Sequence, residues 1–263
     1  MKRIALVVSA RSACNKLIAV ILVLFSLVVL SCSRKPPTPV TDPESASSLQ
    51  RPESVELPKP DTVTKSATNV DAVKPLLAKA INGDAAAQLD LGEMYYQGGE
   101  VPKDYAEALT WFRKAAAQGL PEAQSNIGLM YCQGEGVPQD YAEAMNWFQR
   151  AASHGYAVAQ LNIGGLYHDG QGVPQDYAEA MKWFRKAAEQ DLSQAQFNLA
   201  LMCSRGEGTP MDFVQGYMWG SLAAERDNPS ATFLVSSLEN ALPASQIAQG
   251  RVLAAQWKTK KGK

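Results

Sequence analysis

Apolar residues recur at helical spacing in short segments of this chain, and a glycine follows each segment. The first apolar stripe consists of Ala87, Leu91, Met94 and Tyr95. The same pattern returns in AQSNIGLMYCQG from Ala123, AQLNIGGLYHDG from Ala159 and AQFNLALMCSRG from Ala195. The glycines that follow, suited to ending a helix, are Gly98, Gly134, Gly170 and Gly206. The pattern predicts four copies of a first helix.

A second helix is predicted in each copy by a repeated start signal. An aspartate stands two residues after a proline, at Asp104, Asp140, Asp176 and Asp212. Three residues later come Glu107, Glu143, Glu179 and Gln215. Each start therefore matches a capping box with Asp in place of Ser or Thr.

The two helices together form a unit that repeats at a fixed period. GVPQDYAEAMNWF begins at Gly136 and GVPQDYAEAMKWF at Gly172, a spacing of 36 residues. Such a period predicts a stacked all-α array rather than an ordinary globular core. The residues expected to be structural in every copy are Gly92, Gly128 and Gly164, where helices approach closely, and Trp111, Trp147 and Trp183, which repeat in register.

The repeated motif resembles the Sel-one-like repeat (SLR), a relative of the tetratricopeptide repeat. The resemblance covers about Gly83 to Asp227, with three clear copies and one degenerate copy. It implies a right-handed α/α solenoid of helix-turn-helix repeats that mediates protein–protein contacts and has no chemistry of its own. We therefore expect a protein that is not an enzyme and binds no cofactor.

The N-terminus matches an export signal over residues 1–31. Four basic residues precede or flank the apolar run Leu17–Leu30, whose 14 residues are too few for a transmembrane helix. Val29-Leu30-Ser31-Cys32 resembles a bacterial lipoprotein cleavage box, so we expect lipidation at Cys32. The alternatives are a plain secretory signal and an uncleaved anchor. We expect an outer-membrane lipoprotein facing the periplasm, rather than an inner-membrane or soluble periplasmic one.

The rest of the chain divides by composition. A Pro- and Ser-rich tether is expected at 32–70, an N-terminal capping helix at 71–83, four repeats at 84–227, and C-terminal capping helices with a basic tail at 228–263. The tail could touch anionic lipid or cell-wall polymer, or be solvated. Cleavage before Cys32 changes the formal net charge from −1 to −5, which argues against a nucleic-acid partner.

Few residues suggest chemistry. Cys132 and Cys203 lie two copies apart, too far for a disulfide, and His154 and His168 lack metal-ligand spacing. No nucleophile elbow, phosphate loop or zinc signature occurs, so no catalytic or metal site is predicted. Some cysteine-rich members of the family are described as β-lactamase-like, but this chain lacks their cysteines.

Variation between copies indicates where a ligand would bind. The least constrained positions follow i, i+3, i+7 and i+10 along the first helix, and beside them runs an amide row. The predicted groove consists of Asn126, Asn162, Asn198, Leu161, Phe197, Leu201 and His168. The asparagines would hydrogen-bond an extended peptide, with the apolar side chains offering pockets. The alternative is that they satisfy backbone groups between helices.

The sequence therefore favours a lipid-anchored adaptor that binds a protein or peptide in a concave groove. Two other functions stay open. One is a cell-wall or β-lactam-directed hydrolase, suggested only by outliers of the family. The other is a regulator that binds peptidoglycan or polysaccharide.

Overall fold

The computed structural model describes residues 70–261, and every regular element in that part is a helix. Eleven helices follow one another: α2 (Val70–Ile81), α3 (Ala85–Gln97), α4 (Tyr105–Ala117), α5 (Pro121–Gln133), α6 (Tyr141–Ser153), α7 (Ala157–Asp169), α8 (Tyr177–Ala188), α9 (Ser193–Arg205), α10 (Phe213–Ala224), α11 (Pro229–Ala241) and α12 (Ala244–Lys261). The predicted all-α array of repeated helix pairs is confirmed. The predicted signal peptide, Cys32 and almost all of the tether lie outside the described residues.

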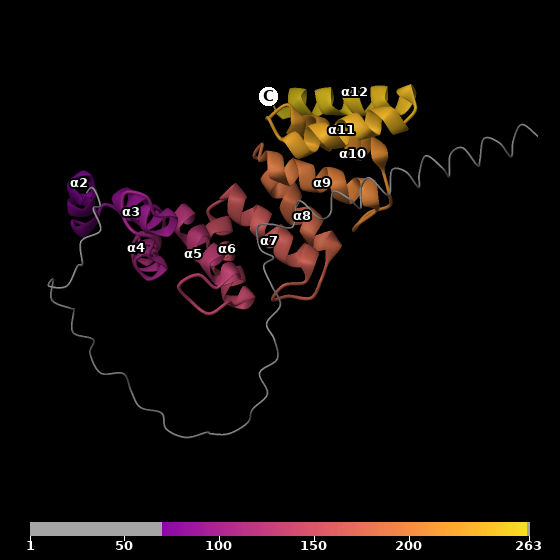
Figure 1. The fold of residues 1–263 in the computed structure, drawn as a ribbon. Coiled ribbons are helices and arrows are strands. Elements are labelled where there is room, and N and C mark those ends of the chain that lie inside the picture. The colour runs from indigo at the N-terminus through magenta and orange to yellow at the C-terminus, as the bar shows by residue number, and fades with distance from the viewer. Residues whose placement is uncertain (1–69, 262–263) are drawn as a thin grey trace, which may run out of the picture.

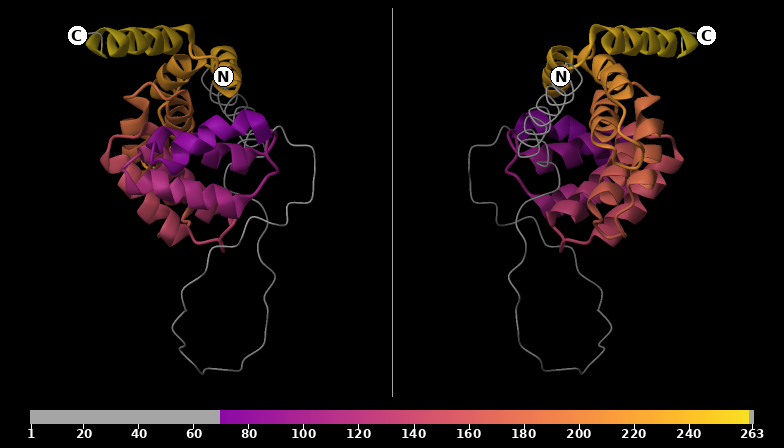
Figure 2. Two further views of the ribbon diagram at one scale, coloured as in Figure 1. Left: turned by 90° about the vertical axis from the view of Figure 1, so that its left-hand side faces the viewer. Right: turned by 90° about the vertical axis from the view of Figure 1, so that its right-hand side faces the viewer.

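The helices pair as hairpins that stack in chain order. The four repeats are α3–α4, α5–α6, α7–α8 and α9–α10, and within each the two helices pack against one another. Each second helix also packs against the first helix of the next repeat. Figure 1 shows this order running from α2 at one end to α12 at the other, and the views in Figure 2 show the helices winding around a common axis. The array is therefore an elongated, curved solenoid.

The repeated aspartates begin the second helices. Asp140 Oδ1 accepts hydrogen bonds from the backbone N–H groups of Ala142 (2.9 Å) and Glu143 (3.0 Å), and the other three aspartates do the same in their repeats. The predicted capping box is closed differently, however. The N–H of Asp140 donates to the carbonyl of Tyr131, 3.0 Å away at the end of the preceding helix, rather than to Glu143. Asp140 therefore starts α6 with its side chain and satisfies the end of α5 with its backbone N–H.

A glycine in the middle of the first helix allows the two helices of a hairpin to pack closely. A Cβ built on Gly128 would lie 2.6 Å from Phe148 Cε1, and the glycines at 92 and 164 lie against phenylalanines in the same way. In the fourth repeat the glycine position holds Ala200, and Gly220 takes the place of the phenylalanine. Both positions of the pair therefore change together, and both are small in the fourth repeat.

The terminal helices differ from the expectation at two points. Helix α2 runs from Val70 to Ile81 with Pro75 inside it, so it ends two residues before the predicted boundary at 83. Helix α12 continues to Lys261, so most of the basic tail is helical. Lys258 pairs with Glu225 at 2.8 Å, and Lys261 pairs with Asp191. These lysines therefore tie α12 to the last repeats.

Candidate binding surface

One stripe along the first helices stays accessible in successive repeats. Its residues are spaced i, i+4 and i+7 along each first helix, so they lie on one face, next to the positions that are buried between hairpins. We call it the first-helix stripe; its residues are Ala86, Asp90, Glu93, Glu122, Asn126, Leu129, Val158, Asn162, Gly165, Gln194 and Asn198, all exposed or half-buried. All four first helices contribute to it in the same register, although its last position in the fourth repeat, Leu201, is buried.

The asparagines of this stripe have no hydrogen-bond partner within the described residues. Asn126, Asn162 and Asn198 are half-buried, and the Nδ2 atom of Asn162 is inaccessible to solvent and still has no acceptor. The polar link between repeats is formed by glutamines instead: Gln88 Nε2 donates to the Ala80 carbonyl at 3.0 Å, and Gln196 Nε2 to Ala188 at 3.2 Å. The alternative, in which the asparagines satisfy backbone groups between helices, is not what the structure contains.

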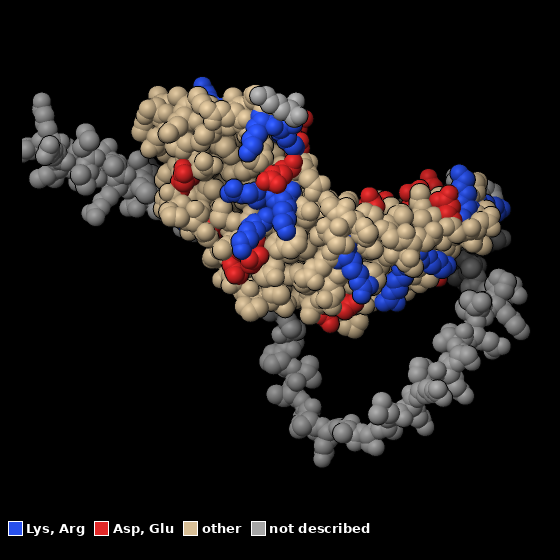
Figure 3. Space-filling view, turned by 180° about the vertical axis from the view of Figure 1, so that it is seen from behind, with Lys and Arg blue, Asp and Glu red and all other residues tan. Residues whose placement is uncertain are grey.

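The N-terminal part of the stripe is acidic. Burial raises the pKa of Tyr156, which lies just before α7, and the nearby carboxylates of Glu122 and Glu93 raise it further. Two carboxylates from α5 and α3 therefore act on one phenol from the next repeat. Figure 3, seen from behind, shows acidic residues along one edge of the N-terminal repeats and basic residues along the opposite edge. A ligand on this part of the stripe meets negative potential.

Two of the predicted pocket residues belong to the core instead. Phe197 is 3% exposed and Leu201 7%, and both are part of the cluster that continues into α11 and α12 through Leu234 and Ile247. Leu161 is half-buried and packs against the same cluster. The reason is orientation: Leu161 and Phe197 lie one residue before the asparagines, which turns them about 100° away from the stripe and toward the neighbouring hairpin. They offer no pocket to a ligand.

His168 also lies between repeats rather than in a groove. Its Nδ1 is 2.7 Å from Asp169 Oδ1, its Nε2 is 3.2 Å from Glu207 Oε2, and its ring meets Tyr177 edge-on at 5.2 Å. Hydrogen bonds to Asp169 and Glu207 raise its pKa to about 9, against a smaller opposing effect of burial. The imidazolium therefore joins the third repeat to the fourth.

The same junction exists between the first two repeats with other residues. Tyr96 donates its hydroxyl to Glu135 Oε2 at 2.7 Å, and Tyr105 donates to Glu135 Oε1 at 2.7 Å. Glu135 and Glu207 are two periods apart, with Gln171 between them. Sequence reasoning missed this acceptor, although a carboxylate or amide one residue after three of the four helix-ending glycines was a usable signal.

The tryptophans lie on the second helices under basic side chains. Lys114 Nζ lies 3.6 Å from the ring centroid of Trp111, Arg150 Cζ 4.5 Å from Trp147, and Lys186 Nζ 3.9 Å from Trp183. In the fourth repeat Trp219 instead packs edge-on against Trp257 of α12, at 4.8 Å. The basic side chains cover these rings, so the row is not an open aromatic platform for a sugar.

Comparison with known proteins assigns the repeats to a family. The Sel1 repeat matches four consecutive segments, residues 85–120, 121–156, 157–192 and 193–228, which together make up more than half of the chain. The chain belongs to the Sel1 repeat family. Sel1 repeat proteins are generally scaffolds for protein–protein interaction and typically do no catalysis. The family resemblance predicted from the sequence is confirmed.

Similar proteins share the fold at moderate identity. A protective antigen of uropathogenic Escherichia coli strains with an SLR fold is 41% identical at a TM-score of 0.62, over 72% of this chain and 40% of that one. A Sel1 repeat protein from Oxalobacter formigenes is 28% identical at a TM-score of 0.58, over 71% and 79%.

A shorter match is to a secretory immunoglobulin A-binding protein, EsiB, of Escherichia coli O6:H1 strain CFT073. It is 49% identical over 43 residues, which are 16% of this chain and 9% of that protein. The Sel1 chain therefore spans well under half of the length of EsiB and of the antigen.

Other candidate groups in the described part of this Sel1 protein are structural. Cys132 and Cys203 are buried thiols and do not form a disulfide with one another. His154 is the C-cap of α6, where it occupies the position held by Gln118 and Gln190 in neighbouring repeats. Between residues 70 and 261, no three His, Cys, Asp or Glu side chains gather in a way that could hold a metal ion, and no helix is long and apolar enough to cross a membrane.

Proposed function

We propose that this Sel1 repeat protein is an envelope adaptor that binds an extended segment of a partner protein along the first-helix stripe. The observation that carries the proposal is the row of unpaired amides, above all Asn162, whose buried Nδ2 has no acceptor. A buried donor without an acceptor costs about 1–3 kcal/mol, and the half-buried Asn162 side chain would remove that cost by turning outward to donate to a ligand carbonyl. An amide both donates and accepts, which suits the backbone of an extended peptide.

The distribution of charge along the stripe predicts which kind of residue the partner segment carries at each end. Asp90, Glu93 and Glu122 lie on α3 and α5, whereas the stripe on α7 and α9 carries uncharged Val158, Asn162, Gly165, Gln194 and Asn198. A segment with Lys or Arg at one end and uncharged residues at the other matches this arrangement. Its association is expected to weaken as salt rises.

The test compares two alanine variants in partner capture. The first replaces Asn126, Asn162 and Asn198 together, and the second replaces Asn146, an exposed asparagine on α6 away from the stripe. Proteins cross-linked to each chain in envelope preparations are identified, and unfolding by urea is followed in parallel. The stripe variant is expected to unfold at or above the wild-type midpoint and to lose a partner that the Asn146 variant keeps. Loss of stability without loss of a specific partner would refute the proposal.

We also propose that the protein is anchored by lipid on Cys32 and faces the periplasm from the outer membrane. Support comes from the lipoprotein-like box that ends in Ser31-Cys32 and from Ser33, which lacks the acidic character associated with inner-membrane retention. The Cys32→Ala variant is expected to shift from the membrane fraction to the soluble fraction and to lose incorporation of labelled palmitate. Membrane retention of that variant would indicate an uncleaved anchor.

The alternative activities have less support in the described residues. A metal-dependent hydrolase needs a cluster of ligands, and residues 70–261 contain no group of three His, Cys, Asp or Glu side chains that could hold a metal ion. A protein that binds polysaccharide by stacking needs accessible aromatic faces, and basic side chains cover three of the tryptophans. Protein binding is therefore the function that this geometry supports best.

A further inference from the structure

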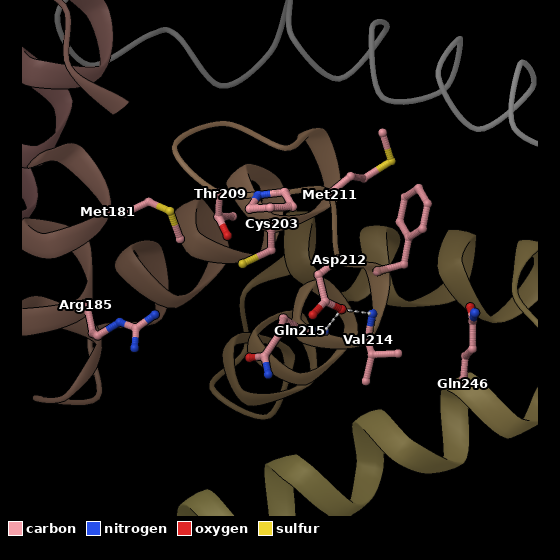
Figure 4. A pocket seen from close by; sticks show the side chains of 11 residues that line it. Met181, Arg185, Cys203, Thr209, Met211, Asp212, Val214, Gln215 and Gln246 are labelled. Atoms are coloured by element: carbon pink, nitrogen blue, oxygen red, sulfur yellow. Dashed lines mark hydrogen bonds between the residues drawn. The ribbon is translucent and has the colours of Figure 1, made fainter. Parts of the chain in front are cut away.

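A second concave site lies at the C-terminal end of the solenoid, apart from the first-helix stripe. A cavity of about 580 Å³ opens between α8, the loop before α10, α10 itself and α12. Met181, Arg185, Cys203 and Gln246 line it, together with Phe213 and its neighbours in sequence (Figure 4). The cavity combines a thioether, an aromatic ring and one guanidinium, which is an unusual set for an unfilled space.

Comparison between repeats explains why the space exists. The position of Cys203 holds tyrosine in every other repeat, as Tyr95, Tyr131 and Tyr167. Tyr131 packs in the core between the first and second repeats, and its hydroxyl accepts a hydrogen bond from Arg113 Nη2 at 3.3 Å. Cys203 replaces that phenol with a thiol, so the volume of a phenol ring is left unfilled.

The arginine that would bind the phenol is still present. Arg185 lies two periods after Arg113, as Cys203 lies two periods after Tyr131. Its guanidinium lines the cavity and has no hydrogen bond or ion pair to any described residue. In Figure 4 the sulfur of Cys203 points toward the side that Met181 and Arg185 form. Met181 and Phe213 supply apolar walls, and Arg185 supplies a donor beside the amides of Gln215 and Gln246. Apolar contact and a hydrogen-bond donor are what a phenol requires.

The cysteine contributes space rather than reactivity. Cys203 is 4% exposed, and burial raises the pKa of its thiol to about 11. Asp212 raises this pKa further, and Arg185 opposes it. At neutral pH the group is a protonated thiol, which is a poor nucleophile and a poor metal ligand. The cavity is therefore suited to non-covalent binding.

We propose that this cavity binds the phenol ring of a tyrosine from a partner protein, with Arg185 donating to the hydroxyl. The inserted ring would restore the packing that Tyr131 provides within the chain. Met211, which is 52% exposed at the rim, would contact the residues beside that tyrosine. This site is separate from the proposed stripe, because the cavity recognises one side chain, whereas the stripe recognises a peptide backbone.

The experiment uses the full chain and two small probes, p-cresol and toluene, which differ only in the hydroxyl. Binding is measured by titration with protein-detected NMR. Wild type is expected to bind p-cresol saturably with a dissociation constant near 1 mM, a value usual for a fragment of this size, and toluene about fivefold more weakly. Arg185→Leu should reduce p-cresol affinity to the level of toluene. Arg113→Leu, the matched change where tyrosine is present, should leave p-cresol binding unchanged.

A cavity-filling variant supplies the second arm. Cys203→Tyr should abolish binding of both probes, because its own ring occupies the cavity. The triple asparagine variant of the stripe should bind p-cresol as wild type does. The proposals for the two sites can therefore be refuted independently of one another. Equal affinity for p-cresol and toluene, or p-cresol binding that Arg185→Leu leaves intact, would overturn the proposal. Because Arg185 is exposed, that variant remains informative even if Cys203→Tyr does not fold.

Discussion

A single histidine, at a position that holds glutamine in the neighbouring repeats, removes one hydrogen bond between repeats. Gln118 Nε2 donates to Gln88 Oε1 at 2.8 Å, and Gln190 Nε2 donates to Gln160 Oε1 at 2.9 Å. His154 occupies the corresponding position in the repeat between them, and Gln124 Oε1 is left buried without a partner. The histidine therefore costs one hydrogen bond that the repeat is built to make.

Replacing that histidine is expected to stabilise the protein. His154→Gln should let the new amide donate to Gln124 and raise the free energy of unfolding by about 1 kcal/mol, measured from the urea midpoint. The reciprocal change, Gln118→His, removes the bond to Gln88 and should lower stability by a similar amount. Effects of the same sign in both variants would contradict this account.

His168 makes stability depend on pH. Its pKa is about 9 in the folded protein, against about 6.5 in an unfolded chain, so the stabilisation is complete below pH 6.5 and is lost as pH rises through 9. The groups around the ring are Asp169, Glu207, the hydroxyl of Tyr177, and Arg205, which lies 3.8 Å from Glu207.

The expected loss between pH 6.5 and 9.5 is on the order of 2 kcal/mol, because the ring is partly exposed. Urea unfolding at several pH values measures it. His168→Gln should remove most of this pH dependence, whereas His154→Gln should retain it. An equal slope in wild type and His168→Gln would show that the repeat junction does not depend on the imidazolium.

At the scale of the element, close packing between paired helices sets the strictest requirement. A Cβ on Gly164 would lie 2.6 Å from the Phe184 ring, whereas a Cβ on the adjacent Gly165 would meet nothing within 4 Å. Gly164→Ala should destabilise by about 1–2 kcal/mol, since the clash outweighs the gain in helix propensity. Gly165→Ala should stabilise by up to about 1 kcal/mol. Opposite shifts in urea midpoint are expected, and parallel shifts would exclude the packing explanation.

The elements that could be predicted from the sequence are those whose residues recur in every repeat; a pair of positions that changes together could not be predicted. The helix pairs and their caps were predictable because each position recurs at 36 residues with one physical reason. The exchange at Ala200 and Gly220 was not, because it depends on α11: a Cβ on Gly220 would lie 3.2 Å from Val235. The repeat pattern changes where a helix outside the repeats packs on it.

The candidate site was predictable only in part for a related reason. Variation between copies was interpreted as freedom from packing, which holds for the exposed Ala86 and Gln194 but not for His168 or Phe197. His168 varies although it is packed, since Tyr96 and Glu135 form the same junction as His168 and Glu207. A position that joins repeats through different side chains and a free surface position both vary, and one sequence cannot separate them.

At the scale of the whole molecule, the solenoid should tolerate losing one whole period. Deleting residues 157–192 joins Tyr156 to Ser193, and these are the junction residues of equivalent repeat boundaries, so every remaining helix keeps a neighbour of the right kind. The shortened chain should stay helical by circular dichroism and unfold at lower urea, with a shorter maximum dimension in X-ray scattering. Its stripe loses Val158, Asn162 and Gly165, so partner capture should weaken.

Deleting half a period provides the control. Removing residues 157–174 joins a first-helix boundary to the start of a second helix and leaves α6 against α8 without the intervening α7. The faces that these second helices present were built to pack on first helices, as α6 does on α7 and α8 does on α9. This variant should expose apolar surface and aggregate or unfold at lower urea than the 36-residue deletion. If the two deletions were equally stable, the molecule would be held together by a single core. Stacking between neighbouring repeats would then not be the basis of its stability. Nor could the stripe be lengthened or shortened repeat by repeat.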